Sequence, residues 1–236
     1  MARTLDPTMH ALRRDEFIDA AQRLITTKGY EQLSVQEILD ELGASKGAFY
    51  HYFDSKAALL EAVVDRMTAT AIATFSPIVD AADLPAPDKL RHFFADVADW
   101  KLERKDLVLE VVRVWYSDEN AIMRDKFRAG MRSRLTPLLT AILRQGAAEG
   151  SMRVSSPEQT AGVVVSLLQG AGDAAGRLFL DRPDGAASLQ EFEDFANTNS
   201  AAMERVLGLA PGSFPLIDPA VARVWHQDIV NTLEPS

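Results

Sequence analysis

Apolar positions recur at intervals of three and four residues along most of the chain, which is the spacing of one face of an α-helix. With capping and helix-breaking residues at the ends, this pattern predicts helices at about 7–28, 35–42, 46–53, 55–75, 87–103, 106–117, 120–149, 157–180, 188–208 and 218–233. Asp88 is a plausible cap of the helix at 87–103. No stretch alternates apolar and polar residues with a period of two, and no segment is repeated. The pattern therefore predicts an all-α fold.

The stretch 34–56 carries the clearest local signals. Ser34 and Glu37 have the S-x-x-E spacing of a capping box, which favours a helix start directly after the serine. Gly43 suits the left-handed residue that ends a helix, and Ser45 suits the N-cap of the next one. Two short helices joined by a glycine turn are therefore expected.

The second of these helices has two distinct faces. At ~100° per residue, Phe49 and Phe53 point inward together, whereas Gly47 and His51 face away from the core and Tyr50 lies at the edge. Small residues beside side-chain donors suit close approach to a duplex. This arrangement is typical of a helix-turn-helix that binds DNA.

The run SKGAFYHYFDSKAALLEAVV resembles the signature of TetR-family transcriptional regulators, and the resemblance extends over about 17–64. It implies an N-terminal three-helix DNA-binding domain and a larger helical bundle that binds an effector and forms a dimer. It also implies a packed face on the first helix, made by Leu12, Phe17, Ala21, Leu24 and Ile25. The residues that it places at the DNA surface are Ser34, Gln36, Ser45, Lys46, Gly47, Ala48, Tyr50, His51, Tyr52 and Lys56.

Some of these positions have two interpretations. Tyr52 fits packing as well as a phosphate contact, and Lys46 alone could be an ordinary surface lysine. Lys56 opens a helix, where the helix dipole disfavours a cation. A bound phosphate would remove that penalty, because helix starts attract anions. We therefore expect Lys56 to contact the DNA backbone.

Charge does not point to DNA as clearly as the motif does. The chain has a net charge of −9, and residues 1–66 contain 8 Lys and Arg against 11 Asp and Glu. A DNA-binding domain usually has a basic surface. We therefore expect the carboxylates of the first two helices to face away from DNA and the cations to gather on the other side.

Composition limits the chemistry. The chain has no cysteine, which excludes disulfides and thiolate chemistry, and its four histidines include no i, i+4 pair for a metal. No nucleophile with a base and no phosphate-binding loop can be assembled. The N-terminus lacks the apolar core of a signal peptide, and the longest apolar run is too short to span a bilayer. The prediction is a soluble, cytoplasmic protein that is not an enzyme and has no cofactor, metal or membrane partner.

The segment 107–115 is apolar on every side except at Glu110 and Arg113, so it should be surrounded by other helices. These two residues could be a self-compensating pair at i, i+3, or either could anchor a polar group of a ligand. Aromatic and methionine side chains nearby could be plain core, but the family resemblance implies an effector cavity among them. The expected ligand residues are Phe93, Trp100, Glu110, Val112, Arg113, Trp115, Tyr116, Phe127 and Met131.

Small residues along 157–180 permit close helix packing, and the resemblance implies that this helix and 188–208 form a four-helix interface between two subunits. The expected domains are 1–56 for DNA and 57–236 for effector binding and dimerisation. The leading hypothesis is a homodimeric regulator, a repressor, that binds a palindromic double-stranded DNA operator and is released by a small, largely apolar effector. The alternative is a helical small-molecule-binding protein or enzyme that retains a non-DNA-binding N-terminal module.

Overall fold

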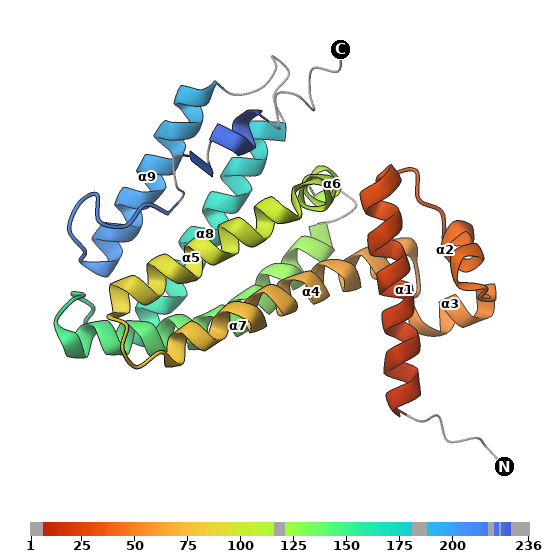
Figure 1. The fold of residues 1–236 in the computed structure, drawn as a ribbon, viewed down its shortest axis with the longest axis horizontal. Coiled ribbons are helices and arrows are strands. Elements are labelled where there is room, and N and C mark those ends of the chain that lie inside the picture. Colours follow the sequence, from red (N-terminus) through yellow and green to blue (C-terminus); the bar gives the residue numbers. More distant parts are fainter. Residues whose placement is uncertain (1–6, 116–120, 181–187, 217–219, 222, 228–236) are drawn as a thin grey trace. The chain divides into compact units, whose positions relative to one another are not determined.

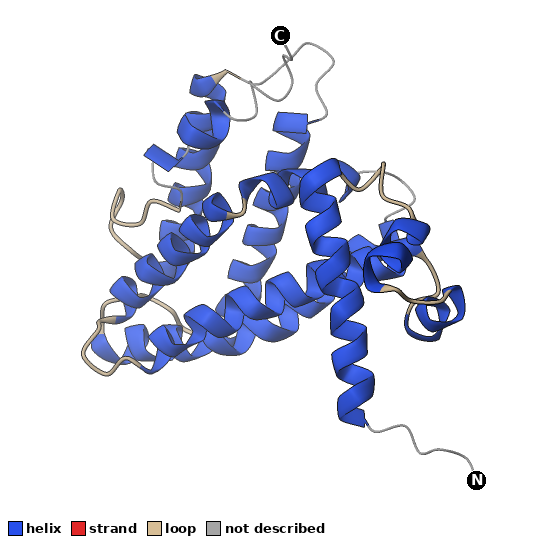
Figure 2. Ribbon diagram, turned by 45° about the vertical axis from the view of Figure 1, so that its right-hand side comes forward, coloured by secondary structure: helices blue, strands red, loops and turns tan. Residues whose placement is uncertain are grey.

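The computed structural model describes residues 7–115, 121–180, 188–216, 220–221 and 223–227. Every regular element within these ranges is a helix, and they contain no strand (Figures 1 and 2). This confirms the all-α prediction. The helices are α1 (Pro7–Lys28), α2 (Val35–Leu42), α3 (Lys46–Tyr52), α4 (Lys56–Phe75), the 3₁₀ helix η1 (Ser76–Asp80), α5 (Ala86–Glu103), α6 (Lys105–Trp115), α7 (Ala121–Glu149), α8 (Pro157–Leu180) and α9 (Leu189–Leu207).

The helix ends follow the sequence signals closely. Proline opens α1 and α8, where its missing N–H has no intrahelical partner to lose. Gly29 follows α1 with φ +84°, and Gly43 ends α2 with φ +57°. Both backbones are left-handed, which glycine adopts without the penalty that other residues meet.

One capping prediction is wrong. The spacing before the fifth helix suggests Asp88 as its N-cap, but α5 begins at Ala86, with Pro85 as N-cap and without a side-chain cap. Asp88 lies in the first turn, where it pairs with Arg91. The free N–H of Ala86 instead donates to the Glu149 carboxylate at 3.0 Å. A carboxylate from a distant helix thus replaces the local cap.

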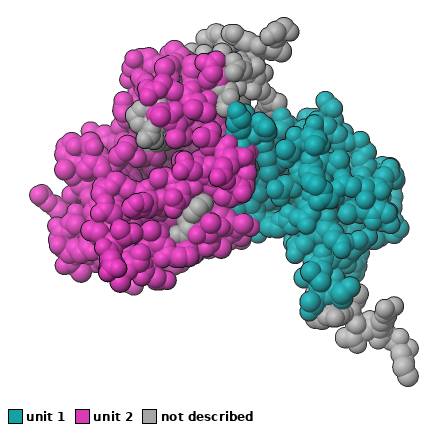
Figure 3. Space-filling view, viewed as in Figure 1, with its two compact units in different colours: residues 1–68, 105–127 teal, residues 69–104, 128–236 magenta. Residues whose placement is uncertain are grey.

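The chain forms two compact units, which Figure 3 shows in different colours. Unit 1 comprises 1–68 and 105–127, and unit 2 comprises 69–104 and 128–236. Helix α4 thus belongs to unit 1 up to Thr68, and α6 belongs to unit 1 although it follows α5 of unit 2. The grouping differs from a division at residue 56, because Leu107 and Val111 of α6 are buried in the core of unit 1. Whether 1–56 and 57–236 divide the functions stays a prediction.

The core of unit 1 is centred on aromatic rings from α1 and α3. Phe17 and Phe49 are fully buried, with ring centroids 5.8 Å apart in an edge-to-face arrangement. Phe53 is 6.2 Å from Phe17 by the same measure. Leu12, expected on this packed face of α1, is 54% exposed, so the packing starts one turn later at Phe17. Buried aromatic area of this kind fixes α3 against α1.

Unit 2 is built around a second apolar core that draws on α5, α7, α8 and α9. Leu143 and Val165 are fully buried there, with Phe214 from the segment after α9. Glu204 holds that segment, since its buried carboxylate accepts from the N–H groups of Gly212 and Phe214 at 3.0 and 2.8 Å. The paired contacts explain how a carboxylate is accommodated inside this core.

Candidate nucleic-acid interface

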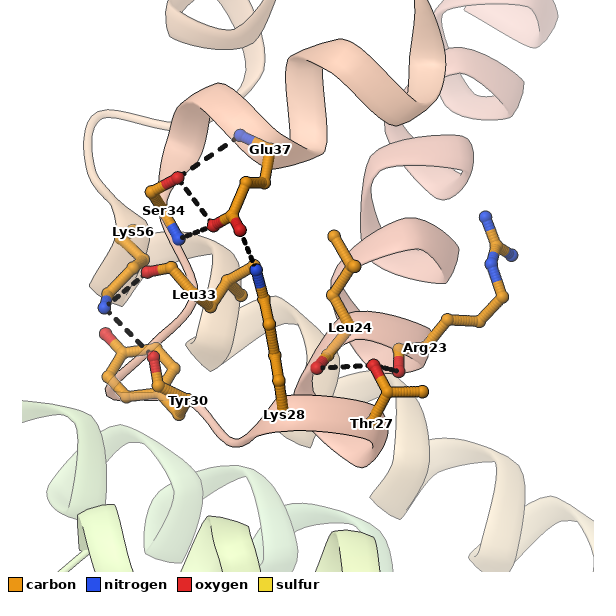
Figure 4. A network of polar contacts seen from close by, with 9 residues as sticks. All are labelled: Arg23, Leu24, Thr27, Lys28, Tyr30, Leu33, Ser34, Glu37 and Lys56. Carbon is orange, nitrogen blue, oxygen red and sulfur yellow. Dashed lines mark hydrogen bonds and ion pairs between the residues drawn. The ribbon is translucent and has the colours of Figure 1, made fainter.

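The start of α2 is fixed by the capping box. The Ser34 hydroxyl accepts from the Glu37 N–H at 3.3 Å, and the Glu37 carboxylate accepts from the Ser34 N–H at 2.9 Å and from its hydroxyl at 2.7 Å. Lys28, at the end of α1, donates to the other oxygen of that carboxylate (Figure 4). Lys28 and Ser34 lower the pKa of Glu37 to about 2. The carboxylate therefore stays ionised, and the helix start stays anchored to α1.

Helix α3 presents the predicted outer face. Ser45 caps it by accepting from the Ala48 N–H at 3.2 Å, and Phe49 is the fully buried residue that attaches it to the core. Lys46 is exposed and so is His51, while Tyr50 is 49% exposed and edge-on to Phe49. Of the other predicted DNA residues, Ser34, Gln36, Ser45 and Gly47 are exposed and Ala48 is partly buried.

Gly47 lies on this exposed face with open space where a side chain would be. A Cβ there would meet nothing within 4 Å except the Ser45 hydroxyl at 3.9 Å. At Gly146, by contrast, a Cβ would lie 2.6 Å from the Met152 sulfur. Packing among the described residues therefore explains Gly146 but not Gly47, although glycine loses more conformational freedom on folding than any other residue. A bare helix surface allows close approach by another molecule.

Tyr52 and His51 belong to a small aromatic group that includes a residue missed by the sequence reasoning. The ring of His10, on α1, lies 4.6 Å from that of Tyr52 and 5.3 Å from that of His51, measured between centroids. Tyr52 is partly buried, 5.7 Å from Phe17. Its ring thus serves packing. In the sequence, His10 is marked only by its position one turn inside α1. Its role becomes visible only when α1 is seen packed against α3.

Lys56, predicted to meet a phosphate, is directed into the protein (Figure 4). Its ammonium donates to the carbonyls of Leu33 at 2.9 Å and Tyr30 at 3.1 Å. It also lies 4.2 Å from the centroid of the Tyr30 ring. An ammonium has three donors, so one remains for another acceptor. The phosphate contact stays a prediction, beside an internal role that the sequence did not indicate.

Several cations of unit 1 are engaged in ion pairs with its carboxylates. Arg23 on α1 donates twice to Glu41 on α2, at 2.6 and 3.0 Å. Other pairs in this unit are Arg13–Glu16, Lys28–Glu37, Arg66–Asp19 and Lys126–Glu61. No carboxylate among the described residues pairs with Lys46, whose ammonium lies 6.0 Å from the Tyr50 ring centroid. The exposed side of α3 therefore keeps its positive charge although the unit is acidic.

The predicted effector residues are divided between the units. In unit 2, Phe93 is 3% exposed within the core, and Met131 packs against that core. Trp100 is partly buried on α5, with the Arg104 guanidinium 4.7 Å from its ring centroid. In unit 1, Phe127 packs against the core. Phe93 thus has the surroundings of a core residue.

The rest of the predicted effector set lies on or after α6. Glu110 and Val112 are partly buried, and a Cβ on Gly29 would lie 2.9 Å from a carboxylate oxygen of Glu110. That oxygen therefore lies against the turn after α1. Tyr116 and the side chains of Arg113 and Trp115 lie outside the described residues. An effector site made by this set stays a prediction.

The surface of α8 has the open character expected of an interface. Gly162 and Gly170 would each gain a Cβ without meeting an atom within 4 Å, and Val163 is 48% exposed. Ala161, by contrast, is fully buried in unit 2. Helix α9 packs beside α8. An open groove here is lined by Arg132, Gln159, Gly162, Val163, Ser166 and Leu167.

Two further classes of site are absent from the part of the chain that the structure describes. None of its helices has the length and apolar character needed to cross a bilayer. No group of three or more His, Asp or Glu in it is placed to hold a metal ion.

Comparison with known proteins places this surface in a family. The family model described as "Bacterial regulatory proteins, tetR family" matches residues 17–63, which extend from α1 to α4. The HTH-type transcriptional repressor KstR2 of Mycolicibacterium smegmatis is 26% identical over 151 residues, covering 62% of this chain and 71% of the repressor. The match therefore extends well beyond the α2–α3 motif.

Solved structures share the fold over most of the chain. A TetR-family regulator from Pectobacterium atrosepticum is similar with a TM-score of 0.62 and 18% identity, covering 86% of this chain and 97% of that one. Thermus thermophilus FadR, a TetR-family repressor in complex with lauroyl-CoA, has a TM-score of 0.55 and 20% identity, covering 72% and 86%. At these identities the likeness concerns the fold.

Proposed function

Because this chain is a transcriptional regulator of the TetR family, we propose that it represses transcription by binding a palindromic operator as a homodimer, and that a small, largely apolar effector releases it. The main support for DNA binding is the exposed face of α3. There Lys46, which has no carboxylate partner among the described residues, adjoins a glycine whose side-chain space is empty, and Tyr50 and His51 lie on the same helix. Such a face admits close approach to a groove edge.

The remaining proposed contacts surround that face. Ser34 caps α2, Gln36 lies in its first turn and Ser45 caps α3, so these residues lie at two helix starts, which suit the phosphates that flank a groove. The Ser34 hydroxyl is committed to the capping box. Its proposed contribution therefore comes from the helix start that it stabilises.

The deciding experiment is a binding titration with DNA taken from beside the protein's own gene, followed by fluorescence anisotropy, with unrelated DNA as competitor. We expect specific binding that Lys46→Ala weakens. Arg23→Ala, which removes a cation already paired with Glu41, is the matched control and should change affinity little. Absence of any DNA preference would favour the alternative of a ligand-binding protein with an inactive N-terminal module.

The homodimer is proposed to form through α8 and α9. It is supported by Gly162 and Gly170, which no residue in the described part of the chain requires to be small. A two-fold dimer would also match the symmetry of a palindromic operator. Gly170→Trp should give monomers by analytical ultracentrifugation, whereas Ala147→Trp, on an exposed position of α7, should leave the dimer intact. Wild-type protein that sediments as a monomer at micromolar concentration would contradict the proposal.

The effector is proposed to be a bulky, mainly apolar molecule bound near the aromatic side chains predicted from the sequence. FadR in complex with lauroyl-CoA supports this class, since its fold is similar to that of this chain. A coupling of ~1–3 kcal/mol changes DNA affinity about 5–150-fold. Quenching of tryptophan fluorescence by a long-chain acyl-CoA, together with weaker DNA binding, is the expected result. Quenching without any change in DNA affinity would show that the protein binds the ligand but that the ligand does not release DNA, which contradicts the proposed regulation.

A further inference from the structure

The ammonium of Lys56 is held at three points by a turn more than twenty residues earlier in the chain. It donates to the carbonyls of Tyr30 and Leu33 and lies 4.2 Å from the centroid of the Tyr30 ring (Figure 4). Lys56 is partly buried, and it is the first residue of α4. Charge-assisted hydrogen bonds of this length are among the stronger ones in proteins.

The two acceptor carbonyls belong to the turn that sets where α2 begins. Leu33 directly precedes the N-cap Ser34, and its N–H donates to the Tyr30 carbonyl at 3.1 Å, which closes the turn. The side chains of Tyr30 and Leu33 are buried, 8% and 3% exposed. The turn is therefore attached to the core by its side chains and to α4 by its carbonyls.

A second lysine holds the same helix start from the other side. Lys28 donates to the Glu37 carboxylate, whose other oxygen accepts from Ser34. The first turn of α2 is thus connected to α1 through Lys28, and the turn before it is connected to α4 through Lys56. Loss of either lysine should leave the other connection in place.

We propose that Lys56 is a positioning residue for DNA binding, which places the start of α2 relative to α3 by fixing the carbonyls of Tyr30 and Leu33. This inference rests on the proposed function, because α2 and α3 are taken to meet DNA together. A lysine whose main contribution is a phosphate contact would act only in the complex. Lys56 acts already in the free protein, and its effect on DNA passes through Ser34 and Gln36.

The test compares two lysines that each open a helix. Lys56→Met removes the ammonium and keeps an apolar chain of similar length, and Lys46→Met does the same on the exposed face of α3. In the DNA-free protein, Lys56→Met should speed hydrogen exchange of the amides at 33–37 by about tenfold, because local opening becomes easier. Lys46→Met should leave those amides unchanged. Lys56→Arg, which can still donate to two carbonyls, should restore slow exchange.

DNA binding gives the second readout. Lys56→Met should weaken binding about tenfold. The slope of log affinity against log salt should stay that of the wild type if the ammonium acts by positioning alone, because the variant then loses no phosphate contact. Lys46→Met should flatten that slope by about one. The loss in Lys56→Met should also overlap with that of Gln36→Ala, so that the double variant is weakened by less than the product of the two.

Several results would overturn the proposal. Unchanged exchange at 33–37 in Lys56→Met would do so whether or not the wild-type protein binds DNA, which separates this inference from the proposed function. A flattened salt slope with unchanged exchange would make Lys56 a phosphate contact only. Faster exchange with unaltered DNA affinity would make it merely structural. If Lys56→Met does not fold, the ¹⁵N-labelled ammonium signal of Lys56 in the wild type decides: slow exchange supports the proposal, and exchange as fast as that of Lys46 refutes it.

Discussion

Lys46 and Lys56 are each the first residue of a helix, α3 and α4 respectively, but Lys46 is exposed and Lys56 is partly buried. Each follows a serine that caps the helix, with Ser45 accepting from Ala48 at 3.2 Å and Ser55 accepting from Ala58 at 3.0 Å. Each places a cation in the first turn, where the helix dipole disfavours it. Lys46 remains exposed, whereas Lys56 reaches two carbonyls of the turn before α2.

The difference shows what decides the role of a lysine at a helix start. The local sequence, serine followed by lysine, is the same at both positions. Helix α4 begins beside a turn whose carbonyls accept from Lys56, whereas no carbonyl or carboxylate of the described residues accepts from Lys46. The outer face of α3 is thus available for recognition, and the turn before α2 is held by internal contacts.

The largest expected effect comes from removing the buried side chain that attaches α3 to the core. Phe49 is fully buried, with ring neighbours at 5.8 Å in both Phe17 and Phe53. We expect Phe49→Ala to lower the free energy of unfolding by ~3–5 kcal/mol through lost burial and a cavity. Urea unfolding followed by circular dichroism measures it. Tyr50→Ala, at the neighbouring exposed position, is the control, and equal losses in both variants would contradict the assigned faces of α3.

Lys46→Ala tests the exposed lysine of α3 without disturbing the core. Because Lys46 has no carboxylate partner among the described residues, its loss should leave the melting temperature nearly unchanged. DNA affinity should fall by ~1–3 kcal/mol if the ammonium meets a base edge. Anisotropy titrations at several salt concentrations report both affinity and slope. Wild-type affinity in this variant would remove Lys46 from the interface.

The sequence predicted the helices and the outer face of α3 because both depend on local patterns. The capping box of Ser34 and Glu37 and the left-handed Gly43 need no information from elsewhere in the chain. The inward turn of Lys56 could not be predicted, since its acceptors lie 23 and 26 residues away in a turn without a marked signature.

The same limit applies to α6. Its apolar surface predicted a helix surrounded by others, but among its described side chains only Leu107 and Val111 are buried, and Val108, Leu109 and Val112 are partly buried. The sequence could not show which core the two buried residues join, and the structure places them in that of unit 1. Asp88 failed as a cap for a related reason, because the partner of the Ala86 N–H comes from the end of α7. Contacts between distant segments decide these positions.

Gly47→Ala separates binding from stability, because the two should change in opposite directions. The added methyl group meets open space within the protein, and alanine favours the helix over glycine by up to ~1 kcal/mol. The free energy of unfolding should therefore rise slightly. DNA affinity should fall, because the added methyl group prevents the closest approach of the helix surface to DNA. Thermal melting and anisotropy on the same sample measure the pair. A variant that is more stable and binds DNA as the wild type does would show that this face does not approach DNA closely.

The smallest expected effect concerns acid stability at the start of α2. The pKa of Glu37 is lowered from 4.5 to about 2 by Lys28 and Ser34, so the folded protein binds this proton less tightly than the unfolded chain does. The stabilisation from the ionised carboxylate is therefore complete above pH 4.5 and is lost as the pH falls towards 2. Wild type should be more stable than Glu37→Gln at pH 7, and the difference should shrink progressively below pH 4.5. Ser34→Ala, which leaves Lys28 in place, should keep part of that pH dependence. A difference between wild type and Glu37→Gln that stays constant from pH 7 to pH 2.5 in urea unfolding would show that the carboxylate is not held in its charged form at this turn.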